Sequence, residues 1–370
     1  MIDKKKLSVV RWDITSKCNF NCSHCYASSL HRSQSSDLSL EEVQVGIKNL
    51  GDPGVSTVMF YGGEPLYRDD IVKVVEACTE QGIQTYITTN GYLLDKKCAA
   101  LVQAGLRGFG VSLDGATEDV YAYIRGGNRY EQVIANFKEL SKLHVASRVI
   151  VMVLMKENAA DASKMIRLAR DLDATGVIYE GLAVDGNALV SKRSTPLEPG
   201  EYVRVFESIV EETLRVGFPV EAINLRMAPP KVVQHLNSKY NVGLDVEQGT
   251  CRAGMNSVFI DSRGLVFPCR GVHPRMTIKT GFKLKGLSVV QNTLHDILRS
   301  DEFSSFFMLG DIRKPSNDLV GCRGCSHLFH DCHPCPIAFA TQQSAHVEGC
   351  INYPLGAICQ ASSESGLNIA

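Results

Sequence analysis

Short runs of β-branched residues alternate with longer amphipathic stretches from Leu7 to about Leu182. The short runs predict strands at Val9–Ile14, Val55–Tyr61, Ile83–Thr88, Gly108–Leu113, Arg148–Leu154 and Gly176–Leu182. The amphipathic stretches predict helices at Leu40–Leu50, Asp69–Gln81, Asp95–Ala104, Tyr130–Leu143 and Ala159–Leu172. Such a series of β–α units is typical of an α/β fold with a parallel sheet, either doubly wound or curled into a complete or partial barrel. In each of these folds, ligands bind at the carboxyl ends of the strands.

The pattern is less regular after Leu182. It predicts a helix, a β-hairpin and a further helix, at Gly200–Val216, at Ser257–Ile260 with Leu265–Phe267, and at about Thr293–Phe307. Cys251 and Cys269 mark the two ends of the hairpin. We therefore predict two domains, residues 1–235 and residues 236–370.

Composition narrows the class of protein. Of the 370 residues, 44% are hydrophobic and 21% are charged, as in an ordinary globular protein, and the formal net charge is -1. Because the chain has no block of basic residues, nothing indicates nucleic-acid binding. No apolar run is long enough to cross a membrane, and the basic residues Met1–Lys6 lead into a predicted strand, not into the apolar core of a signal peptide. We expect a cytoplasmic protein that binds neither nucleic acid nor membrane.

The number and position of the cysteines indicate a more specific chemistry. The chain has 13 cysteines, and eight of them follow Gly249. In a reducing compartment, such a density indicates metal or redox chemistry and not disulfides. Cys78 and Cys98 are exceptions, since each continues the apolar face of a predicted helix, and we expect both in the core.

Three cysteines lie directly after the first predicted strand. The segment CNFNCSHC, residues 18–25, places Cys18, Cys22 and Cys25 in a C-x3-C-x2-C spacing. A loop of this length can fold three thiolates around one iron–sulfur cube and leave its fourth iron without a protein ligand. The alternative is a zinc site, in which His24 would be the fourth ligand although it is crowded between two cysteines.

This spacing after the first strand resembles the radical S-adenosylmethionine (SAM) superfamily, with His24 in the slot that the family fills with an aromatic residue. The resemblance implies a partial (β/α)6 TIM-like barrel and a [4Fe–4S] cluster on Cys18, Cys22 and Cys25. It also implies that the open iron binds the amino and carboxylate groups of SAM. Reductive cleavage of SAM would then give a 5′-deoxyadenosyl radical, which abstracts hydrogen from an unactivated C–H bond.

Further segments resemble the family at the following strand ends. They contain the residues expected to bind SAM, which are Gly62, Gly63, Glu64, Thr88, Asn90, Ser112 and Asp114. The family's Gly-Gly-Glu motif binds the SAM amino group, because glycine allows close approach of the backbone and a carboxylate attracts an ammonium. Arg125 is a candidate for the SAM carboxylate, with a solvent-facing arginine as the alternative.

The cysteines near the C-terminus resemble the SPASM extension of radical SAM enzymes. The family pattern is C-x9–15-G-x4-C, then C-x2-C-x5-C-x3-C, then one further cysteine. The corresponding residues here are Cys251, Gly264, Cys269, Cys322, Cys325, Cys332, Cys335 and Cys350. The chain departs from the pattern by one residue on each side of Cys332. A pair of zinc knuckles is the alternative for this region.

The resemblance implies two auxiliary [4Fe–4S] clusters. The first would be bound by Cys251, Cys269 and Cys335, and the second by Cys322, Cys325, Cys332 and Cys350. The first cluster then lacks a fourth cysteine. We expect that iron to be open to substrate or to take a ligand such as His273 or His333, with Cys359 a weaker candidate.

The resemblance leaves the substrate open. In sulfatase-activating relatives, the residue after the second SPASM cysteine is an aspartate proposed as the base, whereas this chain has Arg270. Only 17 residues precede Cys18, too few for the peptide-recognition domain of many maturases. We predict modification of a ribosomal peptide by oxidation, cross-linking or epimerisation, with a separate recognition protein and an electron donor such as flavodoxin or ferredoxin. The alternatives are a dehydrogenase or epimerase of a small polar metabolite such as a sugar or cyclitol, and a non-catalytic zinc-binding interaction protein.

Overall fold

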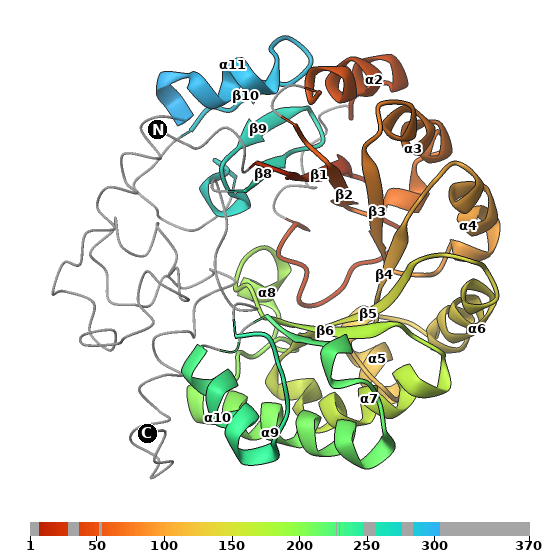
Figure 1. Ribbon diagram of the computed structural model, residues 1–370, viewed down its shortest axis with the longest axis vertical. Coiled ribbons are helices and arrows are strands. Elements are labelled where there is room, and N and C mark those ends of the chain that lie inside the picture. Colours follow the sequence, from red (N-terminus) through yellow and green to blue (C-terminus); the bar gives the residue numbers. More distant parts are fainter. Residues whose placement is uncertain are drawn as a thin grey trace, which may run out of the picture.

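A computed structural model describes residues 7–28, 37–51, 54–226, 228, 230–246, 256–275 and 284–303. In this part of the chain, one ten-stranded sheet has the order β10-β9-β8-β1-β2-β3-β4-β5-β6-β7. Its strands are β1 (Val9–Thr15), β2 (Thr57–Gly62), β3 (Gln84–Thr89), β4 (Gly108–Ser112), β5 (Ser147–Leu154), β6 (Gly176–Gly181), β7 (Ile223–Leu225), β8 (Ser257–Ile260), β9 (Leu265–Phe267) and β10 (Leu287–Ser288). The strands curl into an incomplete ring (Figure 1).

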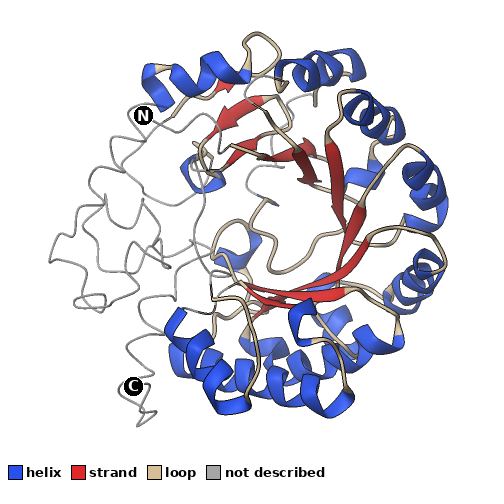
Figure 2. Ribbon diagram, in the orientation of Figure 1, coloured by secondary structure: helices blue, strands red, loops and turns tan. Residues whose placement is uncertain are grey.

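Helices surround this ring on the outside, with the strands inside (Figure 2). They are α2 (Leu40–Asn49), α3 (Ile71–Glu80), α4 (Leu94–Gln103), α5 (Glu118–Arg125), α6 (Tyr130–Ser141), α7 (Ala162–Asp171), α8 (Asn187–Val190), α9 (Pro199–Val216), α10 (Pro230–Tyr240) and α11 (Leu294–Arg299). Short 3-10 turns lie between them at η1 (Pro65–Tyr67), η2 (Lys156–Asp161), η3 (Val220–Ala222) and η4 (Arg270–Val272). This mixed α/β arrangement confirms the predicted TIM-like partial barrel.

The six predicted strands are β1 to β6, and each pairs in parallel with the next. In a parallel sheet, a helix on the outer face carries the chain from the end of one strand back to the start of the next, so all strands run in the same direction. Their carboxyl ends therefore share one edge of the ring. The predicted helices over this part of the chain are also present, with bounds that differ by a few residues at most.

The core lies between the strands and the outer helices. On β1, Val10, Trp12 and Ile14 are buried toward the helices, and Trp12 packs against Gly46 of α2. The alternate position Asp13 faces the interior of the ring, because successive side chains of a strand point to opposite faces. Buried apolar side chains of this kind stabilise the fold by about 1.5–3 kcal/mol each. Cys78 and Cys98 are 0% and 7% exposed, which confirms their prediction as core residues.

The second half of the chain continues the same sheet. Strand β8 pairs in parallel with β1, and β9 runs antiparallel to β8, so the predicted hairpin lies beside the first strand of the barrel. The predicted domain boundary at residue 235 falls inside α10. The division into two domains remains a prediction, since most of residues 236–370 lie outside the described part of the chain.

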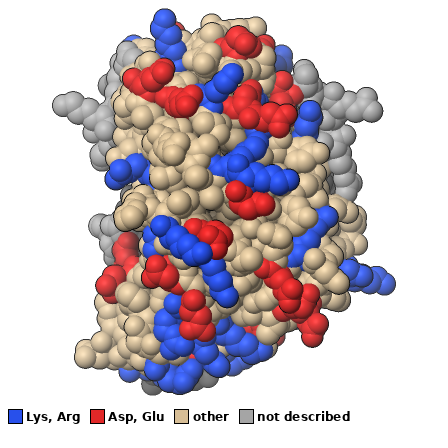
Figure 3. Space-filling model, turned by 90° about the vertical axis from the view of Figure 1, so that its right-hand side faces the viewer, with Lys and Arg blue, Asp and Glu red and all other residues tan. Residues whose placement is uncertain are grey.

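The surface agrees with the balanced charge of the sequence. On the face seen in Figure 3, groups of Lys and Arg side chains and groups of Asp and Glu side chains are scattered among uncharged residues. Among the described residues, no helix is both long and apolar enough to span a bilayer.

Candidate functional site

A loop of residues 16–28 follows β1 and crosses the middle of the ring (Figure 1). We call it the cysteine loop, because it contains Cys18, Cys22 and Cys25. Cys18 is exposed, whereas Cys22 and Cys25 are half-buried. The loop therefore places its three thiols at the carboxyl edge of the sheet, as predicted.

The surroundings of these thiols bear on what they bind. Burial raises the pKa of the Cys22 thiol to about 12, and it also raises the pKa of Cys25. Thiols of this kind become thiolates when a metal replaces the proton. Among the described residues, no three His, Cys, Asp or Glu side chains are arranged to hold a single metal ion. Soft thiolates on one loop fit an iron–sulfur cube, in which each thiolate binds a different iron.

Two glycines bring the loop after β2 against the cysteine loop. Gly63 donates its backbone N–H to the carbonyl of Thr15 at 2.8 Å, and Glu64 donates its own to the carbonyl of Lys17 at 2.8 Å. A Cβ at Gly63 would overlap the Lys17 carbonyl, and Gly62 has a φ of 128°. The glycines thus permit close approach of the backbone to the cysteine loop. The approach of Gly62 and Gly63 to SAM remains a prediction.

The Glu64 side chain is buried, with 1% exposure. Its Oε1 accepts from the Thr89 hydroxyl at 2.6 Å and from the Leu66 N–H at 3.0 Å, and its Oε2 accepts from the Asn90 N–H at 2.7 Å. Burial raises the pKa of this carboxyl, and these hydrogen bonds oppose the rise. In this structure Glu64 joins the loops after β2 and β3, while its predicted contact with the SAM ammonium remains a prediction. Thr89 is not among the residues that the sequence predicts to bind SAM.

Asn90 also holds the cysteine loop. Its Nδ2 donates to Oδ1 of Asn19 at 2.8 Å, and its Oδ1 accepts from the Tyr92 N–H at 3.0 Å. Nearby, the Arg129 guanidinium donates to the Asn19 carbonyl at 3.1 Å and lies 4.3 Å from the centre of the Phe20 ring. The loop after β3 and the start of α6 therefore clamp the cysteine loop from one side.

A buried network holds the other side of the cysteine loop. The Asp114 carboxylate is 0% exposed; its Oδ2 pairs with Nε of Arg125 at 2.7 Å and with Nε2 of His24 at 3.2 Å, and its Oδ1 accepts from the Val153 N–H at 2.8 Å. The Arg125 guanidinium also reaches the Sγ of Cys22 at 4.0 Å. Arg125 is only 6% exposed, so the solvent-facing alternative for it is wrong.

The electrostatics of this network follow from its burial. Burial alone would raise the pKa of Asp114, but Arg125 and His24 outweigh that effect and hold it below its ordinary value. Burial lowers the pKa of His24, and its Nε2 lies 3.2 Å from Oδ2 of Asp114. A paired carboxylate with no exposed surface is thereby fixed beside Cys22. Asp114 acts here as an anchor of the cysteine loop, and its predicted contact with SAM remains a prediction.

Thr88 and Ser112 differ from the residues above. Both are half-buried, and both lie on strand positions that face the interior of the ring. Neither side chain makes a hydrogen bond within the described residues. Their hydroxyls are therefore the members of the predicted SAM set that are available to a ligand in the ring.

Cys269, which follows the hairpin β8–β9, is the one cysteine of the predicted auxiliary-cluster set within the described residues. Cys269 is half-buried, and its Sγ accepts from the Gly271 N–H at 3.2 Å. The other predicted auxiliary-cluster ligands lie outside the described part of the chain, and they are Cys251, Cys322, Cys325, Cys332, Cys335 and Cys350. His333 and Cys359 also lie outside it.

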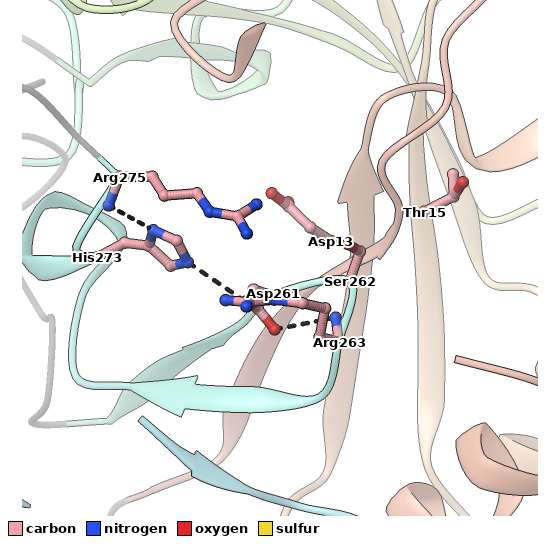
Figure 4. A pocket seen from close by; sticks show the side chains of 7 residues that line it. All are labelled: Asp13, Thr15, Asp261, Ser262, Arg263, His273 and Arg275. Atoms are coloured by element: carbon pink, nitrogen blue, oxygen red, sulfur yellow. Dashed lines mark hydrogen bonds and ion pairs between the residues drawn. The ribbon is translucent and has the colours of Figure 1, made fainter. Parts of the chain in front are cut away.

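His273 is placed in a small pocket between β1 and the hairpin. The pocket is lined by Asp13, Thr15, Asp261, Ser262, Arg263, His273 and Arg275, and the Asp13 and Arg275 side chains point toward each other across it (Figure 4). The His273 ring accepts from the Arg275 N–H through Nδ1 at 3.2 Å and contacts Oδ2 of Asp261 through Nε2 at 3.3 Å. Because both ring nitrogens are engaged, the arrangement does not favour His273 as an iron ligand.

Arg270, at the position of the base in sulfatase activators, lies inside the ring. Its guanidinium pairs with the Asp13 carboxylate. It also lies 4.6 Å from the ring centre of Phe259, 4.9 Å from that of Tyr26 and 5.8 Å from that of Tyr61. A permanently charged guanidinium in this setting cannot accept a proton. The structure thus supports the expectation that this position does not supply a base.

A protein-family model and several characterised proteins match the sequence of this chain. The model of the radical SAM superfamily matches residues 12–169. The chain is 26% identical over 270 residues to an AdoMet-dependent heme synthase of Methanosarcina barkeri, over 70% of this chain and 76% of that protein. It is 24% identical over 313 residues to a GTP 3′,8-cyclase of Pasteurella multocida, over 81% of this chain and 83% of that protein.

Two solved structures share the fold. Streptococcus suis SuiB bound to its precursor peptide SuiA has a TM-score of 0.71 and 18% identity, over 96% of this chain and 76% of that one. Native anSMEcpe with bound AdoMet and Cp18Cys peptide has a TM-score of 0.68 and 19% identity, over 98% of both chains. At these identities the likeness concerns the fold alone.

Proposed function

Because residues 12–169 form a radical SAM superfamily domain and the chain is an enzyme, we propose that it reductively cleaves SAM and takes hydrogen from a substrate C–H bond. One observation carries this proposal. The loop with Cys18, Cys22 and Cys25 lies in the middle of the ring, where three motif segments from the ends of β2, β3 and β4 contact it.

The residues divide into two groups in this proposal. Cys18, Cys22 and Cys25 hold the [4Fe–4S] cluster, and its fourth iron is left for SAM. The cluster and SAM together supply a 5′-deoxyadenosyl radical. Thr88 and Ser112 bind SAM from the interior of the ring, while Glu64, Asn90 and Asp114 with Arg125 orient the loops around it.

Two auxiliary [4Fe–4S] clusters belong to the proposal as well. Cys269 supports it, because this half-buried thiol follows the hairpin β8–β9, whose strand β8 pairs with β1. The remaining ligands are those named above for the first and second cluster. An external one-electron donor such as flavodoxin or ferredoxin would reduce the SAM-binding cluster.

We favour a ribosomal peptide as the substrate, modified by oxidation, cross-linking or epimerisation. Two structures with the same fold and near-complete coverage of this chain hold peptides, SuiA in one and Cp18Cys in the other. Arg270, paired with Asp13, argues against the sulfatase-activating form of this chemistry. A separate protein would present the peptide.

A small molecule is the second candidate. The supporting observation is that proteins with a similar sequence are named for reactions on small molecules, such as a haem synthase and GTP 3′,8-cyclases. The match to the haem synthase spans 70% of this chain. A sugar or cyclitol is a further substrate of this kind. Production of 5′-deoxyadenosine distinguishes the candidates, because it rises when the correct substrate is added.

The proposal is tested by anaerobic reconstitution of the wild type and of a Cys18→Ala/Cys22→Ala/Cys25→Ala variant. The wild type is expected to hold about twelve irons and to form 5′-deoxyadenosine from SAM and a reductant. The variant is expected to hold about eight irons and to form none. Well-folded wild type with stoichiometric zinc, little iron and no SAM cleavage would contradict the proposal and favour the zinc-binding interaction protein.

A further inference from the structure

A segment without a recognisable motif reaches the cysteine loop from the opposite side of the ring. It follows β6, includes α8, and extends to Ser194. In Figure 1, α8 lies on the inner side of the ring next to the cysteine loop. The segments discussed above follow β2, β3 and β4, so this contact comes from a different part of the barrel.

Asn187, the first residue of α8, makes three hydrogen bonds to the cysteine loop. Its Nδ2 donates to the Cys22 carbonyl at 2.9 Å and to Oδ1 of Asn21 at 2.9 Å. Its backbone N–H donates to the Cys25 carbonyl at 3.0 Å. A single residue therefore ties down the backbone of two of the three cysteines.

Gly186 brings this residue into range. Its φ of 57° and ψ of -126° are a combination that side chains disfavour. A Cβ at this position would lie 2.6 Å from the carbonyl oxygens of Cys25 and Tyr26 and 2.6 Å from Oγ of Ser28. The turn is thus in direct backbone contact with the cysteine loop.

The rest of the segment is fixed, so it can act as a support. Ala188 is 5% exposed and packs in a small apolar cluster with Ile124, Met155 and Leu182. Farther along, the Ser194 hydroxyl donates to Oγ of Ser23 at 3.0 Å. The turn is therefore attached to α5 and to the end of β5 on one side and to the cysteine loop on the other.

We propose that Asn187 is a positioning residue for the cluster held by Cys18, Cys22 and Cys25. By fixing the backbone of Cys22 and Cys25, it keeps both thiolates at the spacing that the cube requires. This inference rests on the proposed function, since it assigns no role to Asn187 in the absence of a cluster. A positioning residue is expected to alter cluster retention and the cluster's electronic signature, whereas a merely structural residue alters only the stability of the apoprotein.

The test compares Asn187→Ala and Asn187→Asp with Val190→Ala, in full-length reconstituted protein. Val190 lies on the same helix with 76% exposure and serves as the matched control. The measurements are the rate of iron loss to a chelator, the electron paramagnetic resonance spectrum of the reduced protein with and without SAM, and the melting temperature of the apoprotein. Asn187→Asp keeps the shape and the backbone hydrogen bond but places an acceptor against the Cys22 carbonyl.

Both Asn187 variants are expected to lose the SAM-sensitive cluster about tenfold faster than the wild type and to show an altered spectrum. Val190→Ala is expected to behave as the wild type. Asn187→Asp with wild-type retention and spectrum would overturn the inference, as would changes confined to the melting temperature. A wild type that holds no SAM-sensitive cluster would instead overturn the proposed function itself, so the two failures are distinguishable.

Discussion

Two buried aspartates, Asp114 just after β4 and Asp261 just after β8, have the same kinds of partner. Each contacts Nε2 of a histidine, His24 at 3.2 Å and His273 at 3.3 Å. Each also pairs with an arginine, at 2.7 Å for Asp114 and 2.8 Å for Asp261. The exposure of the two residues is 0% and 5%. The chemistry of the two sites is therefore alike.

Their connections differ. Asp261 also accepts from the backbone N–H groups of Arg263 and Leu265, so its partners come from one hairpin and the turn that follows it. Asp114 instead joins the cysteine loop, α5 and β5. The same set of side chains thus locks a local turn in one place and fixes a functional loop to the barrel in the other.

The largest effect is expected from Asp114→Asn. The substitution leaves the Arg125 guanidinium buried without its counter-charge, and the free energy of unfolding of the apoprotein should fall by about 3–5 kcal/mol. Because His24 also loses its partner, reconstituted protein should hold about four irons fewer than the wild type. Urea unfolding and iron analysis check both values. An unchanged iron content would show that the network of Asp114, Arg125 and His24 is not needed to hold the cluster.

Asp261→Asn is the matched variant of the local site. We expect a loss of about 1–3 kcal/mol, since several hydrogen bonds weaken but the Arg263 guanidinium remains accessible to water. The SAM-sensitive cluster signal should be the same as in the wild type, as judged by electron paramagnetic resonance. If this variant lost that signal as completely as Asp114→Asn, the distinction between a local and a long-range network would be wrong.

The smallest effect is expected in the pH dependence of the unfolding free energy, compared between the wild type and Asp261→Asn. Burial raises the pKa of Asp261, but hydrogen bonds from His273, Leu265 and Arg263 outweigh it and hold the pKa below the ordinary 3.8. The stabilisation is therefore fully present above that value and is lost as the pH falls through the lower pKa of the folded state. The difference in unfolding free energy between wild type and Asp261→Asn should be constant from pH 7 to about pH 5 and shrink below about pH 4. A difference that grew on acidification would contradict this assignment.

The barrel itself could be predicted from the sequence because its signals are local. The periodicity located β1 to β6 and their helices, and the spacing of Cys18, Cys22 and Cys25 located the cysteine loop. The pairing of β8 with β1 could not be read from periodicity, because a parallel pairing between distant strands leaves no local pattern. The helix α5 (Glu118–Arg125), which brings Arg125 to Asp114, was also not predicted.

The structure brings several of the predicted residues together around the cysteine loop, but it gives them partners that the sequence did not predict. Glu64, Asn90 and Asp114 were assigned to SAM, and the structure shows each of them bound to neighbouring loops. Thr89 and Asn187 were not predicted at all. A hydroxyl on the outer face of a strand and an asparagine in a short helix are common in any protein, and only the fold reveals that they meet a motif residue or the cysteine loop.

The proposed function requires that the cysteine loop holds a cluster with an iron open to SAM. Electron paramagnetic resonance of the reduced protein, before and after SAM is added, tests this most directly when the spectrum of the Cys18→Ala/Cys22→Ala/Cys25→Ala variant is subtracted. We expect a [4Fe–4S] signal in the wild type that changes shape when SAM binds, and no SAM-sensitive component in the variant. A signal that SAM leaves unchanged, or one equal in both proteins, would contradict it.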